Sequence, residues 1–408
     1  MRFGEMLRQA RIAKGLTQAE LGAGLYSIHY ISLLERGQRQ PTPEMVQHFA
    51  SRLGMDVQTL NWWVEPPSAD DQPALTIAMF AANYARDMQD DALAASEAEY
   101  AACIAHEQRN APAWWDMSML QAQSLIALRR LEDAENVLQR MANSSLMVAT
   151  AELRSVVEGL LSTIARNTGR LREALDLARR AVASAVDLPD HAPARLQAAF
   201  ILIAALSVKG DLDEAWDVAT SLTISEDAPA VPSLLIARGA WAIGNVAFRR
   251  GEVEIGREQH ALAARLLLPQ TDFELWADFH MSSASLKLQA GVIDDSVRES
   301  ISNADVGLKL VGTQGQRLEL TLAKARFAIM TADLVSAEEL LRTVVGHREL
   351  LGFEAATELE DSLGQYYAAK GSSTQAAHHL TQAAQLYSEA GADEKARELM
   401  DQVRALTA

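Results

Sequence analysis

A repeated turn constrains this chain more than any other feature of its sequence. After residue 75, a turn residue is followed two positions later by a leucine-like residue in most copies, and five positions later by a small residue. Seven copies turn at positions 129, 169, 210, 251, 291, 332 and 371, a spacing of 39 to 41 residues, and a weaker eighth copy turns near Asp90. Pro, Gly and Asn-Ser breaks lie about half a period later, so each unit holds two helices.

Such a period predicts a helix-hairpin solenoid, in which each helix pair buries its apolar faces only against neighbouring pairs. The small residue five positions after each turn lies where the second helix crosses the first, and a larger side chain would hold the two axes apart. Ala is abundant and Pro is rare, at 11 residues, which also favours helices. We therefore expect an all-α fold with about eight helix pairs and a C-terminal capping helix.

Prolines also divide the chain. Pro66, Pro67 and Pro73 lie in one polar segment, which predicts an extended linker over residues 65–74. This linker separates a small module, residues 1–64, from the repeats of residues 75–408. The sequence thus predicts two functional parts.

Charge is distributed unevenly between these parts. The chain has 54 Asp and Glu against 37 Lys and Arg, a net charge of −17, yet residues 1–65 carry +1 and the remainder −18. The acidic remainder argues against a nucleic-acid coat protein and against binding to anionic membranes. Cys103 is the only cysteine, so neither a disulfide framework nor a thiolate zinc site is expected. No run of eighteen apolar residues occurs, and we expect a soluble, cytoplasmic protein without a metal or other cofactor.

The N-terminal module predicts five short helices. Apolar residues recur at helical spacing from Phe3 to Lys14, and Thr17 with Glu20 forms a capping box for a second helix whose buried side holds Leu21 and Leu25. The remaining three helices are expected to begin at Ser27, at Thr42-Pro43 and at Asp56.

This order of helices resembles the Cro/repressor (XRE) helix-turn-helix family. The residues that carry the resemblance are Arg11, Gly15, Leu16, Thr17, Gln18, Leu21, Ile31, Glu35, Arg36, Gly37, Pro41, Ala50 and Leu53. Leu21 and Ile31 are ten residues apart, one fewer than is usual in the family, so the turn before the third helix is shortened.

The resemblance implies that the third helix enters the major groove of double-stranded DNA. It places Ile28, His29, Ser32 and Leu33 against base edges, with Tyr30 beside them. It places phosphate contacts at Gln18, Ser27, Arg36 and Arg39. The alternative is that Ile28 and His29 are ordinary surface residues. Because a charge of +1 attracts DNA only weakly, we expect a homodimer on a palindromic operator.

The repeats resemble the tetratricopeptide repeat (TPR), with a longer period and few of its aromatic signature residues. This resemblance implies a right-handed solenoid that binds ligands on a concave groove lined by the first helix of each pair. Reading the positions that face inward in that family gives candidate ligand-binding residues Gln123, Asn167, Trp241, Asn245, Arg249, Gln289 and Arg326. Carboxamides pair with an extended peptide backbone, and arginines bind its carboxylate. The alternative is a solvated surface without a ligand.

The combined order resembles the peptide-sensing quorum regulators of the Rgg/PlcR/PrgX type. It implies a transcriptional regulator that senses a short signalling peptide. The alternative is a DNA-binding regulator whose repeats dock a folded protein. No catalytic or metal-binding set competes, since the adjacent His378 and His379 point in different directions from a helix, so an enzyme is not expected.

Overall fold

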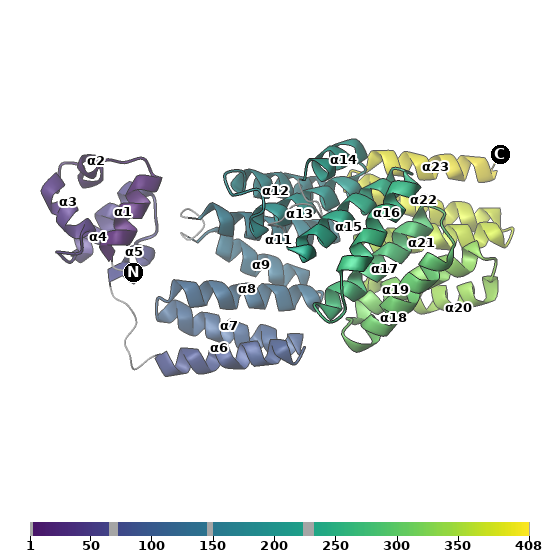
Figure 1. The fold of residues 1–408 in the computed structure, drawn as a ribbon, viewed down its shortest axis with the longest axis horizontal. Coiled ribbons are helices and arrows are strands. Elements are labelled where there is room, and N and C mark those ends of the chain that lie inside the picture. Colours follow the sequence, from purple (N-terminus) through teal and green to yellow (C-terminus); the bar gives the residue numbers. More distant parts are fainter. Residues whose placement is uncertain (1–2, 65–71, 145–149, 223–231, 408) are drawn as a thin grey trace. The chain divides into compact units, whose positions relative to one another are not determined.

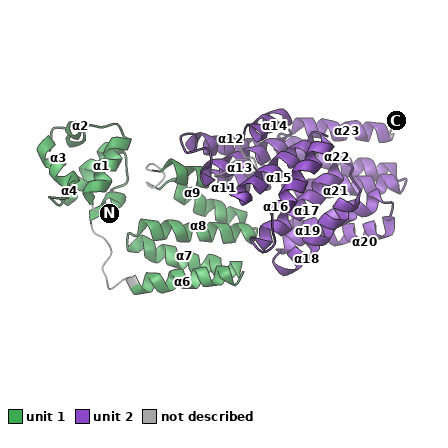
Figure 2. Ribbon diagram, viewed as in Figure 1, with its two compact units in different colours: residues 1–157 green, residues 158–408 purple. Residues whose placement is uncertain are grey.

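The computed structural model describes residues 3–64, 72–144, 150–222 and 232–407 (Figure 1). Every regular element in these ranges is a helix, which confirms the predicted all-α class. The chain divides into two compact units, Met1–Val157 and Glu158–Ala408 (Figure 2). The predicted linker lies largely outside the described residues.

Unit 1 begins with the five predicted helices: α1 (Phe3–Ala13), α2 (Gln18–Gly22), α3 (Ile28–Glu35), α4 (Pro43–Leu53) and α5 (Val57–Val64). We call these five helices the head. The Thr17–Glu20 capping box is present, and Ser27 and Thr42 cap α3 and α4. A shared core fixes the helices, and its largest fully buried members are Leu7, Leu21, Ile31, Leu34, Phe49, Leu53 and Leu60.

The prediction for Leu25 is wrong. Its side chain is 71% exposed rather than buried. The reason is that α2 ends at Gly22, and Ala23 and Gly24 then adopt left-handed conformations with φ of 43° and 79°. The shortened turn therefore directs Leu25 away from the core, beside the start of α3.

The rest of the chain consists of paired helices. Unit 1 contains α6 (Gln72–Asp87), α7 (Asp91–Glu107), α8 (Ala111–Ala127) and α9 (Leu131–Ala142), and α11 (Ala151–Asn167) crosses the boundary between the units. Unit 2 continues with α12 (Leu171–Ser184), α13 (Pro193–Lys209), α14 (Leu212–Ser221), α15 (Ser233–Arg249), α16 (Val253–Leu266), α17 (Phe273–Gln289), α18 (Asp295–Leu310), α19 (Gln314–Met330), α20 (Leu334–Val345), the 3₁₀ turn η1 (Arg348–Leu350), α21 (Phe353–Ala369), α22 (Ser373–Ala390) and α23 (Asp393–Thr407).

The predicted turn residues share one backbone conformation. All seven have positive φ, between 61° and 105°, and Gln89 adds the eighth turn with φ of 57°, one residue before the expected Asp90. Glycine reaches this region without strain, whereas Arg129 and Ala332 do so at a cost. The repeat read from the sequence is therefore a repeat of backbone geometry.

The small residues after these turns also lie where they are expected. Six are fully buried alanines: Ala94, Ala134, Ala174, Ala215, Ala337 and Ala376. A Cβ added to Gly256 would lie 2.8 Å from the ring of Phe248 on the preceding helix. Ser296 is the exception. The turn after Gly291 is longer, so Ser296 donates its Oγ hydrogen to the N-cap residue Asp294, and the fully buried Val297 packs at this level of the helix.

Within unit 2, the first helices of consecutive pairs pack side by side, from α13 through α15, α17 and α19 to α21. The unit also closes on itself. Leu171 and Val208 share a buried cluster with Ala392, and the ring of Phe353 packs against the same cluster. Residues near the two ends of unit 2 therefore meet.

Candidate functional site

The third helix of the head presents its first turn to solvent. Ser27 Oγ accepts a hydrogen bond from the backbone N–H of Tyr30, which starts α3 there. Ile28 is 57% exposed and His29 is also exposed, while Tyr30 is half-buried and stacks on Tyr26. An isoleucine held in water at the first turn of a helix matches the predicted position for base contact.

The other side chains predicted to contact DNA differ in their solvent exposure. Ser32 and Leu33 are half-buried, and Arg36 and Arg39 are exposed. Arg36 Nε donates to the carbonyl oxygen of Ser32 at 3.1 Å, leaving its terminal nitrogens at the end of α3. Leu25, missed by the sequence prediction, adds an exposed apolar side chain beside Ile28; only the early end of α2 reveals it.

A buried ion pair fixes α1, α2 and α3. Arg11 Nε and Nη2 donate to the two carboxylate oxygens of Glu35 at 2.5 and 3.0 Å, and Arg11 Nη1 donates to the carbonyl oxygen of Leu16 at 2.9 Å. The hydrogen bonds that Arg11 donates to Glu35 raise the pKa of Arg11. Gln18 Nε2 donates to Glu35 at 2.8 Å, so this predicted phosphate contact also takes part in the internal network.

A second group of functional candidates lies inside unit 2. We define the inner surface by the side chains of Arg166, Arg249, Ser285, Arg326, Glu354, Glu358, Asp361 and Lys395, which interact across unit 2. Its centre is Glu354 on α21. Arg166 Nη1 donates to Glu354 Oε1 at 2.5 Å, and Arg249 Nη2 donates to Glu354 Oε2 at 2.8 Å. The sequence separations are 188 and 105 residues, so only the closure of unit 2 brings these groups together.

These charges shift one another's ionisation. Burial opposes the ionised form of Glu354, but Arg249, Arg166 and Lys395 outweigh it and lower the pKa of the carboxyl to about 2. Burial lowers the pKa of Lys395 to about 7, and the charge of Arg249 contributes further, against the attraction of Glu354. The centre is therefore an ionised carboxylate among two arginines and a lysine whose charged form is disfavoured by burial.

The inner surface continues along α21. Ser285 Oγ lies 3.2 Å from both carboxylate oxygens of Glu358, and Arg326 Nη1 donates to Asp361 at 3.1 Å. Burial raises the pKa of Glu358, against the opposing charge of Arg326. The acidic side chains of α21 thus pair with polar side chains of α17 and α19.

The predicted groove residues occupy different surroundings. Arg249 and Arg326 belong to the inner surface, and Gln289 is exposed, with its Nε2 donating to Ser285 Oγ at 3.2 Å. Trp241 Nε1 donates to Ser282 Oγ at 3.3 Å, and Asn245 Oδ1 lies 3.0 Å from Nε2 of the buried His260.

The two remaining predicted groove residues lie elsewhere. Asn167 is half-buried at the end of α11, and Gln123 is exposed on α8 in unit 1. Gln123 is therefore not part of the inner surface, which consists of residues of unit 2.

Sequence reasoning missed the acidic members of this surface. Glu354, Glu358 and Asp361 occupy positions i, i+4 and i+7 of one helix, a spacing that places them on one face. That spacing was available from the sequence. Arg166 and Lys395 carry no comparable signal, because only the closure of the unit makes them neighbours of Glu354.

Comparison with known protein families identifies the head. Residues 2–63 match a helix-turn-helix domain. This match confirms the predicted DNA-binding fold of the head. Comparison with curated proteins gave no match.

Solved structures similar to most of the chain include the following three. PlcR of Bacillus thuringiensis, in complex with the peptide PapR7 and DNA, is 11% identical; the alignment covers 78% of this chain and 98% of PlcR, with a TM-score of 0.41. A Rap protein complexed with competence and sporulation factor is 10% identical over 99% of this chain and 98% of its own, with a TM-score of 0.49. The Rap conjugation gene regulator of the plasmid pLS20, complexed with the Phr* peptide, is 14% identical over 85% and 95%, with a TM-score of 0.47.

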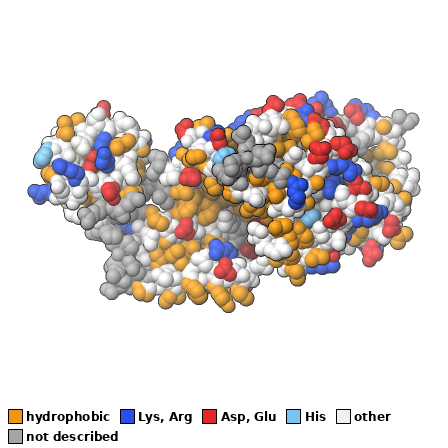
Figure 3. Space-filling view, viewed as in Figure 1, with side chains coloured by type: hydrophobic (Ala, Val, Ile, Leu, Met, Phe, Trp, Pro, Cys, Tyr) orange, Lys and Arg blue, Asp and Glu red, His pale blue; other side chains and the backbone are white. Residues whose placement is uncertain are grey.

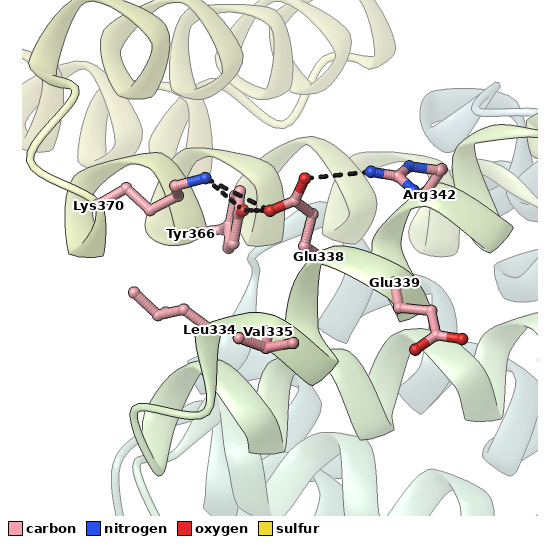
Figure 4. A pocket seen from close by; sticks show the side chains of 7 residues that line it. All are labelled: Leu334, Val335, Glu338, Glu339, Arg342, Tyr366 and Lys370. Carbon is pink, nitrogen blue, oxygen red and sulfur yellow. Dashed lines mark hydrogen bonds and ion pairs between the residues drawn. The ribbon is translucent and has the colours of Figure 1, made fainter.

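A hollow of about 440 Å³ lies outside the helix-turn-helix domain, between α20 and α21 (Figure 4). Glu338 accepts hydrogen bonds there from Tyr366 Oη at 2.6 Å, Arg342 Nη2 at 3.1 Å and Lys370 Nζ at 3.4 Å. Besides these mutually paired polar groups, the hollow is lined by the exposed Glu339 and by the apolar Leu334 and Val335.

The described residues contain neither a metal-binding cluster nor a membrane-spanning helix. No group of three or more His, Cys, Asp or Glu side chains there is arranged to hold a metal ion. None of the described helices combines the length and the apolar composition needed to cross a membrane.

Proposed function

We propose that this chain is a homodimeric, DNA-binding transcriptional regulator whose second unit binds a short peptide. The helix-turn-helix match over residues 2–63 carries the DNA-binding part, supported by the exposed first turn of α3. Ile28 and Leu33 contact thymine methyl groups in this proposal, while His29 and Ser32 hydrogen-bond base edges. Arg36, Arg39, Ser27 and Gln18 contact phosphates, and Tyr30 flanks the bases.

The peptide part rests on the chemistry of the inner surface. Carboxamide and guanidinium groups of the first helices, such as Gln289, Arg249 and Arg326, offer donors to the carbonyl groups and the carboxylate of an extended chain. Asn167 and Trp241 are further members of this set of donors. Asn245 also belongs to it, and its side chain is held by the contact of its Oδ1 with His260 Nε2.

Glu354 acts as an internal substitute for the ligand carboxylate. It already engages Arg166 and Arg249 as an incoming carboxylate would, and it remains one-third exposed. A peptide that displaces it releases α21 from α11 and α15. Binding thus changes the closure of unit 2. The peptide then has a different affinity for the state in which Glu354 holds the arginines and for the state in which it has been displaced. Regulation by a ligand requires such a difference in affinity between two states.

DNA binding is tested by selecting operator sequences from a random duplex library and measuring affinity for the selected site. His29→Ala and Ile28→Ala are each expected to weaken binding by about tenfold or more. Ile12→Ala is the matched control, because Ile12 on α1 is also 57% exposed. Equal effects of the Ile12 and Ile28 changes would remove α3 from base recognition.

Peptide binding is tested with a synthetic library of peptides of five to eight residues, prepared with free and with amidated C-termini. The wild type is expected to retain free-carboxylate members and to change its operator affinity on binding them, whereas Arg249→Ala is expected to retain few. Retention of both forms alike would contradict the role of the arginines. Failure to retain any peptide, together with capture of a folded protein that alters operator affinity, would replace peptide sensing by protein docking.

A further inference from the structure

The first helix pair of the repeats carries a continuous apolar stripe on its outside. Ile77, Phe80 and Tyr84 on α6 and Met88 directly after its end follow one another at intervals of three or four residues, and Leu93 and Tyr100 are seven residues apart on α7. All six side chains are between 45% and 69% exposed. The rings of Phe80 and Tyr84 stack on each other at 6.0 Å. We call these six residues the α6–α7 stripe; Figure 3 shows hydrophobic side chains along the edge where α6 lies.

The stripe is unusual in its lack of charge. Residues 72–85 contain no charged side chain, and their polar side chains are Gln72, Thr76 and Asn83. The inner face of α6 is already filled by Leu75, Ala78, Ala82 and Ala85. Large apolar side chains that gather on the outside of such a helix mark an interaction surface. The other large exposed apolar residues occur singly or in pairs, such as Leu268 alone and Val306 with Leu310 on α18, as is normal on protein surfaces.

The stripe lies on the first helix pair of the repeats, and this position also indicates that a partner covers it. Terminal repeats need a polar outer face for solubility. The C-terminal helix α23 follows this rule, with exposed Asp393, Glu394, Arg397 and Glu398. The first pair does the opposite and presents an apolar side where a preceding pair would pack.

We propose that a second copy of this chain covers the α6–α7 stripe, so that the homodimer of the proposed function forms here. The six side chains expose on the order of 700 Å², taking about 200 Å² for a large side chain, which approaches the ~800 Å² that each partner contributes to a stable interface. An uncharged stripe is complementary to itself, as a two-fold symmetric interface requires.

The length of chain between head and stripe fits this interface. Only residues 65–71 separate α5 from α6. Seven residues reach at most ~25 Å, and two heads on half-sites one helical turn apart lie each ~17 Å from the two-fold axis. Dimerisation at α6 therefore tethers both heads within reach of one palindrome.

The test is sedimentation of the full chain without DNA. The wild type is expected to be a dimer at micromolar concentration, and Phe80→Glu is expected to weaken dimerisation by about 100-fold because it buries an unpaired charge. Val335→Glu on α20 is the matched control, since Val335 is more exposed than any stripe residue. A monomeric wild type, an unaffected Phe80→Glu dimer, or equal dissociation by Val335→Glu would each overturn the proposal.

A cysteine cross-link covers the case in which Phe80→Glu fails to fold. In a Cys103→Ser background, Tyr84→Cys is expected to form a disulfide-linked dimer on mild oxidation, and Val335→Cys is not. No cross-link at Tyr84, or equal cross-linking at both positions, would contradict the interface. Because neither experiment contains DNA, a monomeric result leaves DNA reading by α3 intact, and loss of operator binding by a stable dimer leaves the interface intact.

Discussion

The α6–α7 stripe and the inner surface of unit 2 depart from the usual distribution of side chains in opposite directions. The stripe holds large apolar side chains in water, whereas the inner surface holds ionised groups inside a closed unit. Both are built from the same helix-hairpin repeat. The difference shows that a uniform scaffold presents two chemically opposite surfaces, for which we propose two occupants, another copy of the chain on the apolar one and a small polar ligand on the charged one.

The largest expected effect on stability is at Glu354. Glu354→Leu leaves Arg166, Arg249 and Lys395 without their shared carboxylate, and we expect the free energy of unfolding to fall by about 2 kcal/mol. This is less than the 3–5 kcal/mol of a fully buried pair, because Glu354 is one-third exposed. Urea unfolding at pH 7 measures it. Glu394→Leu, on the exposed side of α23, is the control and is expected to change stability by less than ~0.5 kcal/mol.

The same carboxyl predicts a dependence on pH. Its folded pKa of about 2 lies below the ordinary value of 4.5. Its stabilisation is therefore complete above pH 4.5 and is lost as the pH falls toward 2. The difference between wild type and Glu354→Leu is expected to shrink over that range, and a constant difference would show that packing rather than charge is responsible.

A smaller effect of opposite sign is expected at Asp278 on α17. Burial raises the pKa of its carboxyl to about 7, and Gln316 Nε2 donates to it at 2.6 Å. Because the folded pKa exceeds the ordinary 3.8, ionisation costs stability as the pH rises from 3.8 through 7. Asp278→Asn keeps an acceptor for Gln316 and is expected to gain about 1–2 kcal/mol at pH 8 and nothing at pH 4. An equal gain at both pH values would contradict this explanation.

The smallest effect is expected on the stripe. Ile77→Gln is expected to change the unfolding free energy of the monomer by less than ~0.5 kcal/mol, since Ile77 is 68% exposed. Urea unfolding at concentrations below the dimerisation range measures it. A loss of 2 kcal/mol or more would mean that the stripe belongs to the core of unit 1, and the contrast with the inner surface would disappear.

Local features of this fold were predictable from the sequence. Thr17 with Glu20, Ser27 and the turn glycines act within a few residues, and the structure places each of them as expected. Arg129 and Ala332 were found only through the period, because neither residue type favours positive φ. Leu25 was misassigned because helical periodicity was extended past the point where α2 ends.

The candidate sites were less predictable, for a different reason. The exposed turn of α3 follows from the helix-turn-helix pattern alone. The partners of Arg249 do not, because Glu354 is 105 residues away and becomes a neighbour only when unit 2 closes. Similarly, the apolar residues of α6 were visible in the sequence, but their exposure depends on which face packs against α7.

The closure of unit 2 has a consequence for folding. An open solenoid unfolds from its ends, one repeat at a time, because each repeat touches only its neighbours. In unit 2 the contact of Arg166 with Glu354 spans 188 residues, so breaking either end also removes stabilising contacts from the other. Fraying is therefore suppressed, and we expect unit 2 to unfold in one concerted transition. Because this contact forms only after the intervening helices are in place, the chain has to assemble most of unit 2 before its ends can meet.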